Sequence, residues 1–315
     1  MRSLALALLL ALTASAARAD VAPIRAVRTD QPIKMDGILD EAIWKHDAPV
    51  TGFLQREPDR GVDPRQRTEV RVAFDDDALY VGARMYDTAP DSIRERLGRR
   101  DSDPGSDMFG LLLDPFHDKR TGYYFAVNAA GTLMDGVLLN DDWDDDSWDG
   151  VWHGHAHRDE QGWTCEMKIP FSQLRFRVTD PMVWGISFKR WTPRYSGEDE
   201  LAFPPRGQSG YVSRFPELHG LDGLKTRQHI ELTPYVTQKS EHLQFDGGSL
   251  DEFDPADPYH SGWNGKLAAG GDLRMSVGSK FTLNATVNPD FGQVEIDPAV
   301  VNLSDVENFF QEKRP

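Results

Sequence analysis

The sequence predicts an all-β protein, an antiparallel β-sandwich followed by part of a β-meander or barrel. Short apolar or alternating runs are separated by clusters of Asp, Gly and Pro, which is the pattern of strands joined by turns. Residues 106–132 show this pattern in full, with an apolar run, a polar tip and an alternating return strand. Longer alternating runs after residue 223 predict the second, meander-like part.

The individual strands follow from periodicity. Residues 108–113 are almost wholly apolar, which is typical of a strand covered on both faces, and the proline of Asp114-Pro115 ends its pairing. The return strand at residues 123–128 leads through a turn into another strand at residues 133–139. Further strands are predicted at residues 69–74, 79–86, 151–157, 162–169 and 182–188. Residues 194–214 are rich in Pro and Gly, and we predict that they form a long connection that lines a site.

The N-terminal sequence and the composition limit the compartment and the partners that this protein can have. Arg2, an apolar run and the small-residue site Ala17-Arg18-Ala19 predict a signal peptide of residues 1–19, and hence export. The net charge of −16 repels phosphate backbones, so no nucleic-acid partner is expected. The single cysteine, Cys165, excludes an internal disulfide and is predicted to be a buried, inert thiol.

We expect two domains, a sandwich at residues 20–220 and an incomplete unit at residues 221–315. In the second, apolar residues such as Leu267, Leu273 and Leu283 alternate with polar or small ones. This alternation fits outer-membrane barrel strands as well as a soluble meander. Because three or four strands cannot close a bacterial barrel, the chain is expected to be a truncated product or a fragment.

Several stretches resemble a known family. PIKMDGILDEAIW, TEVRVAFDDDALYVGARMYD, SDMFGLLLDPFHDKRTGYYFAVNAAG and WTCEMKIPFSQLRF resemble the family 9 carbohydrate-binding module, and more closely its variant at the front of a large uncharacterised bacterial envelope family. LNATVNPDFGQVEIDPAVVNLSDVENFFQEKRP resembles the signature of the predicted outer-membrane barrel in that family. The resemblance implies a jelly-roll-like sandwich that recognises glycans, attached to the membrane through a C-terminal barrel that is largely missing.

The resemblance also implies a sugar site between two tryptophans. This chain has Pro104-Gly105 where the first tryptophan is expected, Ala126 in place of an arginine, and a retained asparagine. Ring faces stack on the C–H side of a sugar, so exposed tryptophans extend the candidate set, although packing as core or loop anchors is the alternative for each. The predicted sugar-binding residues are Asn128, Trp191, Phe203, Trp143 and Trp148.

Two aspartate clusters predict a structural Ca²⁺ site, with solvated acidic loops as the alternative. One has the one-three-five spacing of a calcium loop, but Ser147 replaces the required glycine and His153 the bidentate glutamate, which excludes an EF-hand. The predicted ligands are Asp142, Asp144 and Asp146 in that cluster, and Asp101, Asp103 and Asp107 in the other.

Three histidines recur at every second position of a predicted strand: His153, His155 and His157. They project from one face, where two imidazoles can share a zinc or copper ion. A polar strand face in water gives the same pattern.

These observations predict an exported, non-catalytic carbohydrate-binding module of a Gram-negative envelope protein, located in the periplasm or outer membrane. Its ligand would be a glycan or oligosaccharide in carbohydrate catabolism. One alternative is part of a glycoside hydrolase acting on O-glycosyl bonds, although no catalytic residue is predicted and no Ser-His-Asp elbow, P-loop or His-Glu-x-x-His motif occurs. The other is a periplasmic plug or assembly domain without a sugar ligand.

Overall fold

The computed structural model describes residues 22–224, 230–243, 262–277 and 281–288. Contacts between residues divide the chain into two units, Met1–Thr226 and Arg227–Pro315. Within the described ranges every regular element is a β-strand or a short 3-10 helix, which confirms the predicted all-β class. None of the helices in these ranges has the length and apolar character needed to cross a membrane.

The first unit contains a large sheet, sheet A, whose central strands are the predicted meander. These are β6 (Met108–Asp114), β7 (Gly122–Asn128) and β8 (Leu133–Leu139). Sheet A has nine strands, and its main path runs β1-β14-β12-β6-β7-β8-β9, with β13 and β3 attached beside β12. The remaining strands are β1 (Ile24–Arg25), β3 (Leu54–Glu57), β9 (Trp143–Asp145), β12 (Trp184–Thr192), β13 (Gly197–Glu200) and β14 (Glu217–His219).

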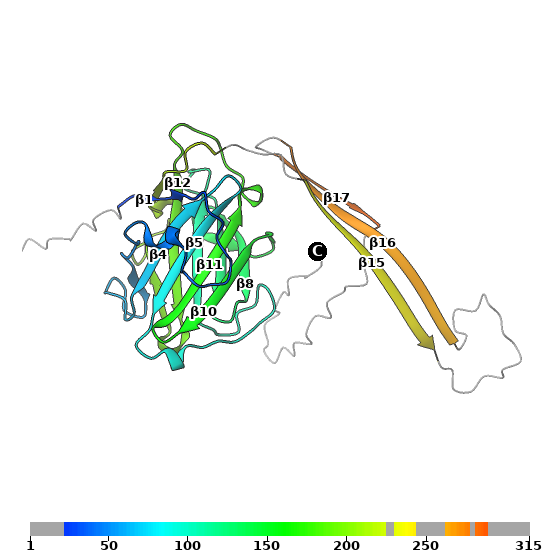
Figure 1. The fold of residues 1–315 in the computed structure, drawn as a ribbon, viewed down its shortest axis with the longest axis horizontal. Helices are drawn as coiled ribbons and strands as arrows, with labels where there is room; N and C mark the ends of the chain where they lie inside the picture. The colour runs from blue at the N-terminus through cyan, green and yellow to red at the C-terminus, as the bar shows by residue number, and fades with distance from the viewer. Residues whose placement is uncertain (1–21, 225–229, 244–261, 278–280, 289–315) are drawn as a thin grey trace, which may run out of the picture. The chain divides into compact units, whose positions relative to one another are not determined.

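Sheet B lies against sheet A and has the order β10-β11-β5-β4-β2. Figure 1 shows β4, β5, β11 and β10 running side by side. Pairing is antiparallel throughout the sandwich except for two short parallel pairs, β1 with β14 and β2 with β4. The strands of sheet B are β2 (Val27–Arg28), β4 (Thr68–Phe74), β5 (Ala78–Tyr86), β10 (His153–Asp159) and β11 (Gly162–Pro170).

The core of the sandwich lies between the two sheets. Inward-facing side chains of sheet A, such as Phe109, Phe125 and Phe188, pack with those of sheet B, such as Trp163. Each is fully buried, and burying an apolar side chain of this size contributes about 1.5–3 kcal/mol. Cys165 belongs to the same core, which confirms that its thiol is buried.

Residues 33–45, which include the 3-10 helix η1 (Ala42–Lys45), cover the outer face of sheet B. The Trp44 ring packs directly on Gly82, where a Cβ atom would lie 2.8 Å from the ring. The buried carboxylate of Glu166 accepts hydrogen bonds from the backbone N–H groups of Asp36 (3.0 Å) and Gly37 (2.9 Å) and from the indole N–H of Trp44 (2.9 Å). One carboxylate of β11 therefore holds the covering segment in place.

The free face of sheet A, which points away from the core, is closed at one side by a second cluster. Phe203, Tyr211 and Phe215 pack there against Leu112 and Leu138. Phe203 and Tyr211 lie in the connection predicted at residues 194–214, and Phe215 directly follows it. The 3-10 helix η4 (Pro193–Tyr195) begins one residue before this connection, and η5 (Val212–Arg214) ends it. The rest of this face is open and forms the candidate site.

The described residues of the second unit form a three-stranded antiparallel sheet of order β15-β16-β17. The strands are β15 (Ile230–Leu243), β16 (Gly262–Val277) and β17 (Phe281–Val287). Its register puts Leu232, Leu273 and Ala285 on one face and Thr233, Asp272 and Thr286 on the other. The predicted two-sided alternation is therefore present in these strands.

Candidate functional site

The candidate site is a groove of about 380 Å³ on the free face of sheet A. Strand register arranges the residues of this face in rows across the strands, here called rungs, because partners on neighbouring antiparallel strands lie side by side on one face. One rung holds Ala126, Gly110, Lys189 and Glu200. The rung beside it holds Asn128, Met108, Trp191 and Glu198.

The floor of the groove is apolar and partly aromatic. Gly110, Ala126, Met108 and Met134 belong to its lining. The half-buried ring of Tyr124 lies over Gly136, where a Cβ atom would be 2.5 Å from the ring. These residues present a shallow surface rather than a deep apolar cavity.

One wall of the groove carries the cations Lys189 and Arg56 and the carboxylate of Glu198, with Glu200 buried behind them. The Lys189 ammonium lies 2.6 Å from Glu198, and the Arg56 guanidinium lies 2.9 Å from Glu200 and 3.7 Å from Glu198. The Tyr211 hydroxyl donates to Glu200 at 3.1 Å. The side chain of Glu200 is fully buried, while Lys189 and Arg56 are each about a third exposed (33% and 32%). The cations therefore face the solvent side of this wall.

The protonation states in the groove follow from burial and neighbouring charge. Burial raises the pKa of Glu200 to about 7, against the opposing effect of Lys189 and Arg56. Burial also acts to raise the pKa of Glu198, but the ion pair with Lys189 outweighs it and the net pKa is lowered. Burial, followed by the nearby charge of Asp144, raises the pKa of Tyr124. The Tyr124 phenol is therefore a hydroxyl donor at neutral pH, and it has no hydrogen-bond partner among the described residues.

Raising the pH from about 5 to about 8 is expected to lower the free energy of unfolding through Glu200. The ordinary pKa of a glutamate carboxyl is 4.5, whereas the pKa of Glu200 in the folded protein is about 7. Between these values the folded state holds a proton that the unfolded chain has released. The resulting stabilisation is fully present below pH 4.5 and is lost as the pH rises through about 7.

Urea unfolding across this range measures the effect, with Glu200→Gln as the comparison. The wild-type chain should lose more stability than the variant between about pH 5 and pH 8. Parallel pH curves for the two proteins would contradict the raised pKa of Glu200.

At the far end of the groove, Asp142 and Asp144 form an exposed acidic rim. Neither carboxylate has a hydrogen-bond or ion-pair partner within the part of the chain that the structure describes. Both were predicted as calcium ligands together with Asp146, which is also exposed. In the structure, two of the three border the groove instead of converging on one point in the loop.

The predicted sugar-binding residues take different positions. Trp191 lies half-buried on the free face, beside Met108 and Glu198. Asn128 shares that rung, but it is only 3% exposed and its amide serves the following turn. Its Oδ1 accepts from the N–H groups of Ala130 (3.0 Å) and Thr132 (2.8 Å), and its Nδ2 donates to a backbone carbonyl (2.9 Å). The structure thus gives Asn128 a structural role.

The other predicted aromatic residues are mostly packing residues. Phe203 is buried beneath the guanidinium of Arg60, 5.1 Å from the ring centroid. Trp148 packs edge-on against Tyr123 (5.1 Å) and Phe125 (5.9 Å), as a loop anchor does. The backbone of Trp143 lies in β9, but its side chain is outside the described part of the structure.

The structure groups the predicted metal ligands differently from the sequence. Asp101 lies in a cluster with Asp135 and Asp149, with ligand atoms within 4.8 Å of one another, the one such group found among the described residues. Arg100 pairs with Asp135 and lies 3.5 Å from both other carboxylates, so a positive charge already occupies the cluster. Burial raises the pKa of Asp101 to about 6.

Two further predicted ligands close local loops. Asp103 accepts a hydrogen bond from the backbone N–H of Gly105 (2.8 Å), and the buried Asp107 accepts one from Arg94 (3.0 Å). Calcium binding stays a prediction. Asp135 was missed, although an acidic residue inside the otherwise apolar run at residues 133–139 was a signal available in the sequence.

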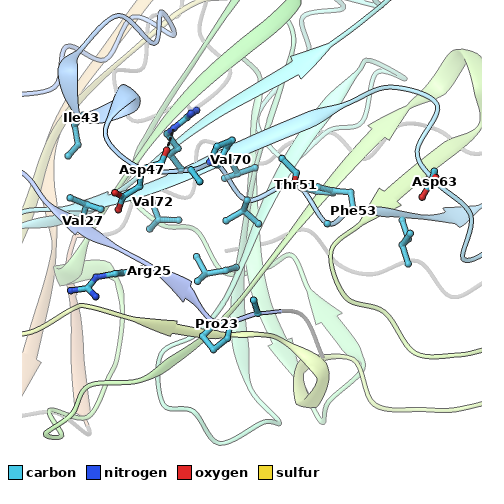
Figure 2. A pocket seen from close by; sticks show the side chains of 18 residues that line it. Pro23, Arg25, Val27, Ile43, Asp47, Thr51, Phe53, Asp63, Val70 and Val72 are labelled. Atoms are coloured by element: carbon cyan, nitrogen blue, oxygen red, sulfur yellow. Dashed lines mark hydrogen bonds between the residues drawn. The ribbon is translucent and has the colours of Figure 1, made fainter. Parts of the chain in front are cut away.

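A larger hollow of about 820 Å³ opens at the edge of the sandwich, between β1, β4 and residues 47–54 (Figure 2). Figure 2 shows that its lining is dominated by core side chains such as Val70, Val72 and Phe53. Near its rim, Asp47 pairs with His46 (3.1 Å), and the backbone carbonyl of Asp47 accepts from Arg71 (3.1 Å). The groove on sheet A offers more hydrogen-bonding groups, and we take it as the candidate site.

Comparisons with known proteins give one family model and several solved structures. Residues 229–315 match the model of a family described as "Domain of unknown function (DUF5916)". No curated protein matches the chain. Among solved structures, the chain is similar to a family 9 carbohydrate-binding module from Caldicellulosiruptor kristjanssonii in complex with glucose. The sequence identity is 16% and the TM-score is 0.45, and the match covers 65% of this chain and 96% of that one.

Two other structures are similar. The same type of module from C. kristjanssonii, in complex with cellotriose, matches at 17% identity and a TM-score of 0.44, over 64% of this chain and 94% of that one. A protein from Bacteroides uniformis ATCC 8492, described as a candidate carbohydrate-binding protein, matches at 11% identity and a TM-score of 0.49. The match covers 63% of this chain and 99% of that one. These proteins are of the class that the sequence motifs resemble.

Proposed function

We propose that the groove on the free face of sheet A binds a carbohydrate, so that the first unit acts as a carbohydrate-binding module. The observation that carries this proposal is the meeting, in one cavity, of an apolar floor with a charged, hydrogen-bonding wall. A sugar ring presents C–H faces and hydroxyl edges at the same time. Its C–H face fits on Gly110, Ala126 and the Tyr124 ring, while its hydroxyls meet the wall.

The charge of each polar group in the groove determines whether it donates or accepts hydrogen bonds to the sugar. The Lys189 ammonium and the Tyr124 hydroxyl donate to sugar oxygens, and the Glu198 carboxylate accepts from sugar hydroxyls. Asp142 and Asp144 at the rim provide further acceptors for a second sugar unit. The ion pair with Lys189 holds the Glu198 carboxylate in place on the wall.

The expected affinity is low. Trp191 is the one tryptophan that the described residues place on the free face near the groove, so a ring-to-ring clamp on the sugar is not formed by the described side chains. We expect a dissociation constant of about 1 mM, which corresponds to about −4 kcal/mol.

Calorimetric titration of the full chain tests the proposal. Glucose and cellotriose, the sugars named for two of the compared structures, are the first ligands to use. Tyr124→Ala should weaken binding about tenfold, because it removes a ring face and a donor worth about 1–2 kcal/mol together. Tyr235→Ala, the same substitution in the second unit, is the control and should change nothing. Absence of binding to a wider panel of oligosaccharides would refute the proposal.

We further propose that the second unit contacts lipid, which would place the module at the outer membrane and in the periplasm. One face of its sheet exposes large apolar side chains, including Leu232 (68% exposed), Val236 (69%) and Leu267 (73%). Membrane strands need about 9–11 residues, and β15 and β16 have 14 and 16. Their apolar and polar faces alternate as they do in outer-membrane strands.

Flotation of the full chain with phosphatidylethanolamine–phosphatidylglycerol vesicles tests the lipid contact. Leu232→Asp combined with Leu267→Asp should abolish co-flotation, because both substitutions put charge on the apolar face. Thr233→Asp, on the opposite face of the same strand, is the control and should leave it intact. Equal loss in both variants, or no flotation of the wild-type chain, would argue against lipid contact.

A further inference from the structure

The strand β10 forms the outer edge of sheet B and presents three histidines to solvent. His153, His155 and His157 are all exposed, whereas Gly154 and Ala156 between them point to the other side of the strand. Gly154 has no room for a side chain, since a Cβ atom there would lie 2.8 Å from Leu133 and from Trp152. Packing of Gly154 against Leu133 and Trp152 therefore fixes which side of β10 faces inwards. The three imidazoles consequently lie on the outer face of sheet B.

The spacing of these histidines suits metal chelation. Residues two apart on a strand lie about 6.6 Å from each other along the chain. A zinc–imidazole bond is about 2.0–2.1 Å long, so two side chains tilted towards each other reach a single ion. Neither His153 nor His155 has a hydrogen-bond or ion-pair partner among the described residues, which leaves their ring nitrogens free to bind one.

The two pairs of neighbouring histidines, His153 with His155 and His155 with His157, have different surroundings. The turn at Asp36-Gly37 packs on the peptide between Ala156 and His157, because a Cβ atom on Gly37 would lie 2.8 Å from the Ala156 carbonyl carbon. The interval from His155 to His157 is therefore occupied by the chain. The interval from His153 to His155 is not covered by this turn.

The charged residues opposite the open interval are engaged elsewhere. Lys168 lies opposite His153 in register, but its ammonium is turned over the Tyr80 ring, 5.5 Å from the centroid. Glu166, whose buried carboxylate binds three N–H groups, lies opposite His155.

We propose that His153 and His155 bind one divalent transition-metal ion of borderline softness, such as Cu²⁺ or Zn²⁺, with water completing its coordination. Neutral imidazole is a preferred ligand of both ions, and the Irving–Williams order makes Cu²⁺ the tighter of the two. This site lies on sheet B, whereas the groove lies on the free face of sheet A. Metal binding is therefore independent of the proposed sugar binding.

Titration of the full chain with Cu²⁺ and with Zn²⁺ tests the site, using protein purified without a polyhistidine tag. His153→Ala and His155→Ala should each weaken binding at least about tenfold, because each removes a direct ligand. His157→Ala should change the affinity less than about threefold. His46→Ala, which removes an exposed histidine that pairs with Asp47 elsewhere, is the control and should have no effect.

A second readout identifies the ligands. The electron paramagnetic resonance spectrum of the Cu²⁺-loaded chain should show coupling to two nitrogens in the wild type and to one in His155→Ala. The two alanine substitutions are on exposed positions, so melting temperatures should match the wild type without metal. Unchanged affinity in His155→Ala, or an equal loss in His157→Ala, would overturn the assignment.

Discussion

Replacing Glu166 with alanine is expected to lower the free energy of unfolding by about 3 kcal/mol or more. Its carboxylate is fully buried and accepts from two backbone N–H groups and from the Trp44 indole. Alanine leaves all three donors without their acceptor under the segment at residues 33–45. Each buried donor that loses its partner costs about 1–3 kcal/mol, reduced where water reaches the site.

Two comparisons make this result specific. Glu166→Gln keeps one acceptor oxygen and should lose roughly half as much stability. Glu160→Ala, at an exposed position in the adjoining turn, should be neutral within about 0.5 kcal/mol. Urea unfolding followed by tryptophan fluorescence gives the three values, and hydrogen exchange at residues 33–45 should accelerate in Glu166→Ala. A loss below about 1 kcal/mol would show that Glu166 does not hold the covering segment.

Replacing Gly110 with leucine is expected to weaken sugar binding by at least about tenfold, or 1.4 kcal/mol. Gly110 lies on the groove floor, and the atoms nearest to a Cβ there are 3.8 Å (Phe125 carbonyl oxygen) and 3.9 Å (Ala126 and Lys189 Cβ) away. These are ordinary van der Waals distances, so the substitution fits the strand. The rest of the leucine side chain must then project into the space that a sugar would occupy.

The fold should tolerate this change, which separates blocked binding from unfolding. Glycine inside a strand is less favourable than a residue with a side chain, so the melting temperature should stay the same or rise. Gly265→Leu, on β16, is the matched control, since nothing lies within 4 Å of a Cβ at that position. Undiminished affinity in Gly110→Leu would place the sugar somewhere other than the groove.

The long strands were predictable because apolar or alternating runs of six or more residues mark them. The strand predicted at residues 133–139 has those same limits in β8, and the run at residues 108–113 becomes β6 with one more residue. The short strands β3, β9 and β13 were missed. Their sequences, such as Gly197–Glu200, are polar or charged and carry no apolar period. They pair because the register of β12 brings Glu198 and Glu200 beside Trp191 and Lys189, which is a long-range property of the fold.

The site was predictable only in part. Alternation indicates which side chains of β7 share a face, but it does not show which face stays open. Asn128 was chosen for its residue type, whereas its amide closes the turn to Thr132. Lys189 and Glu198 come from different strands, so their ion pair has no local signal in the sequence. Trp191 was chosen, like Trp143 and Trp148, as a tryptophan whose ring could stack on a sugar, and the structure places it half-buried on the free face.

The most direct test of the sugar-binding groove is chemical-shift mapping of the deuterated full chain during titration with cellotriose. Binding in the groove predicts that the amide signals that move are those of residues 108–112, 124–126 and 189–198. Signals of β10 and β11 on the outer face of sheet B should remain still. Movement confined to residues 143–148, or to any region away from the free face of sheet A, would contradict the proposed site.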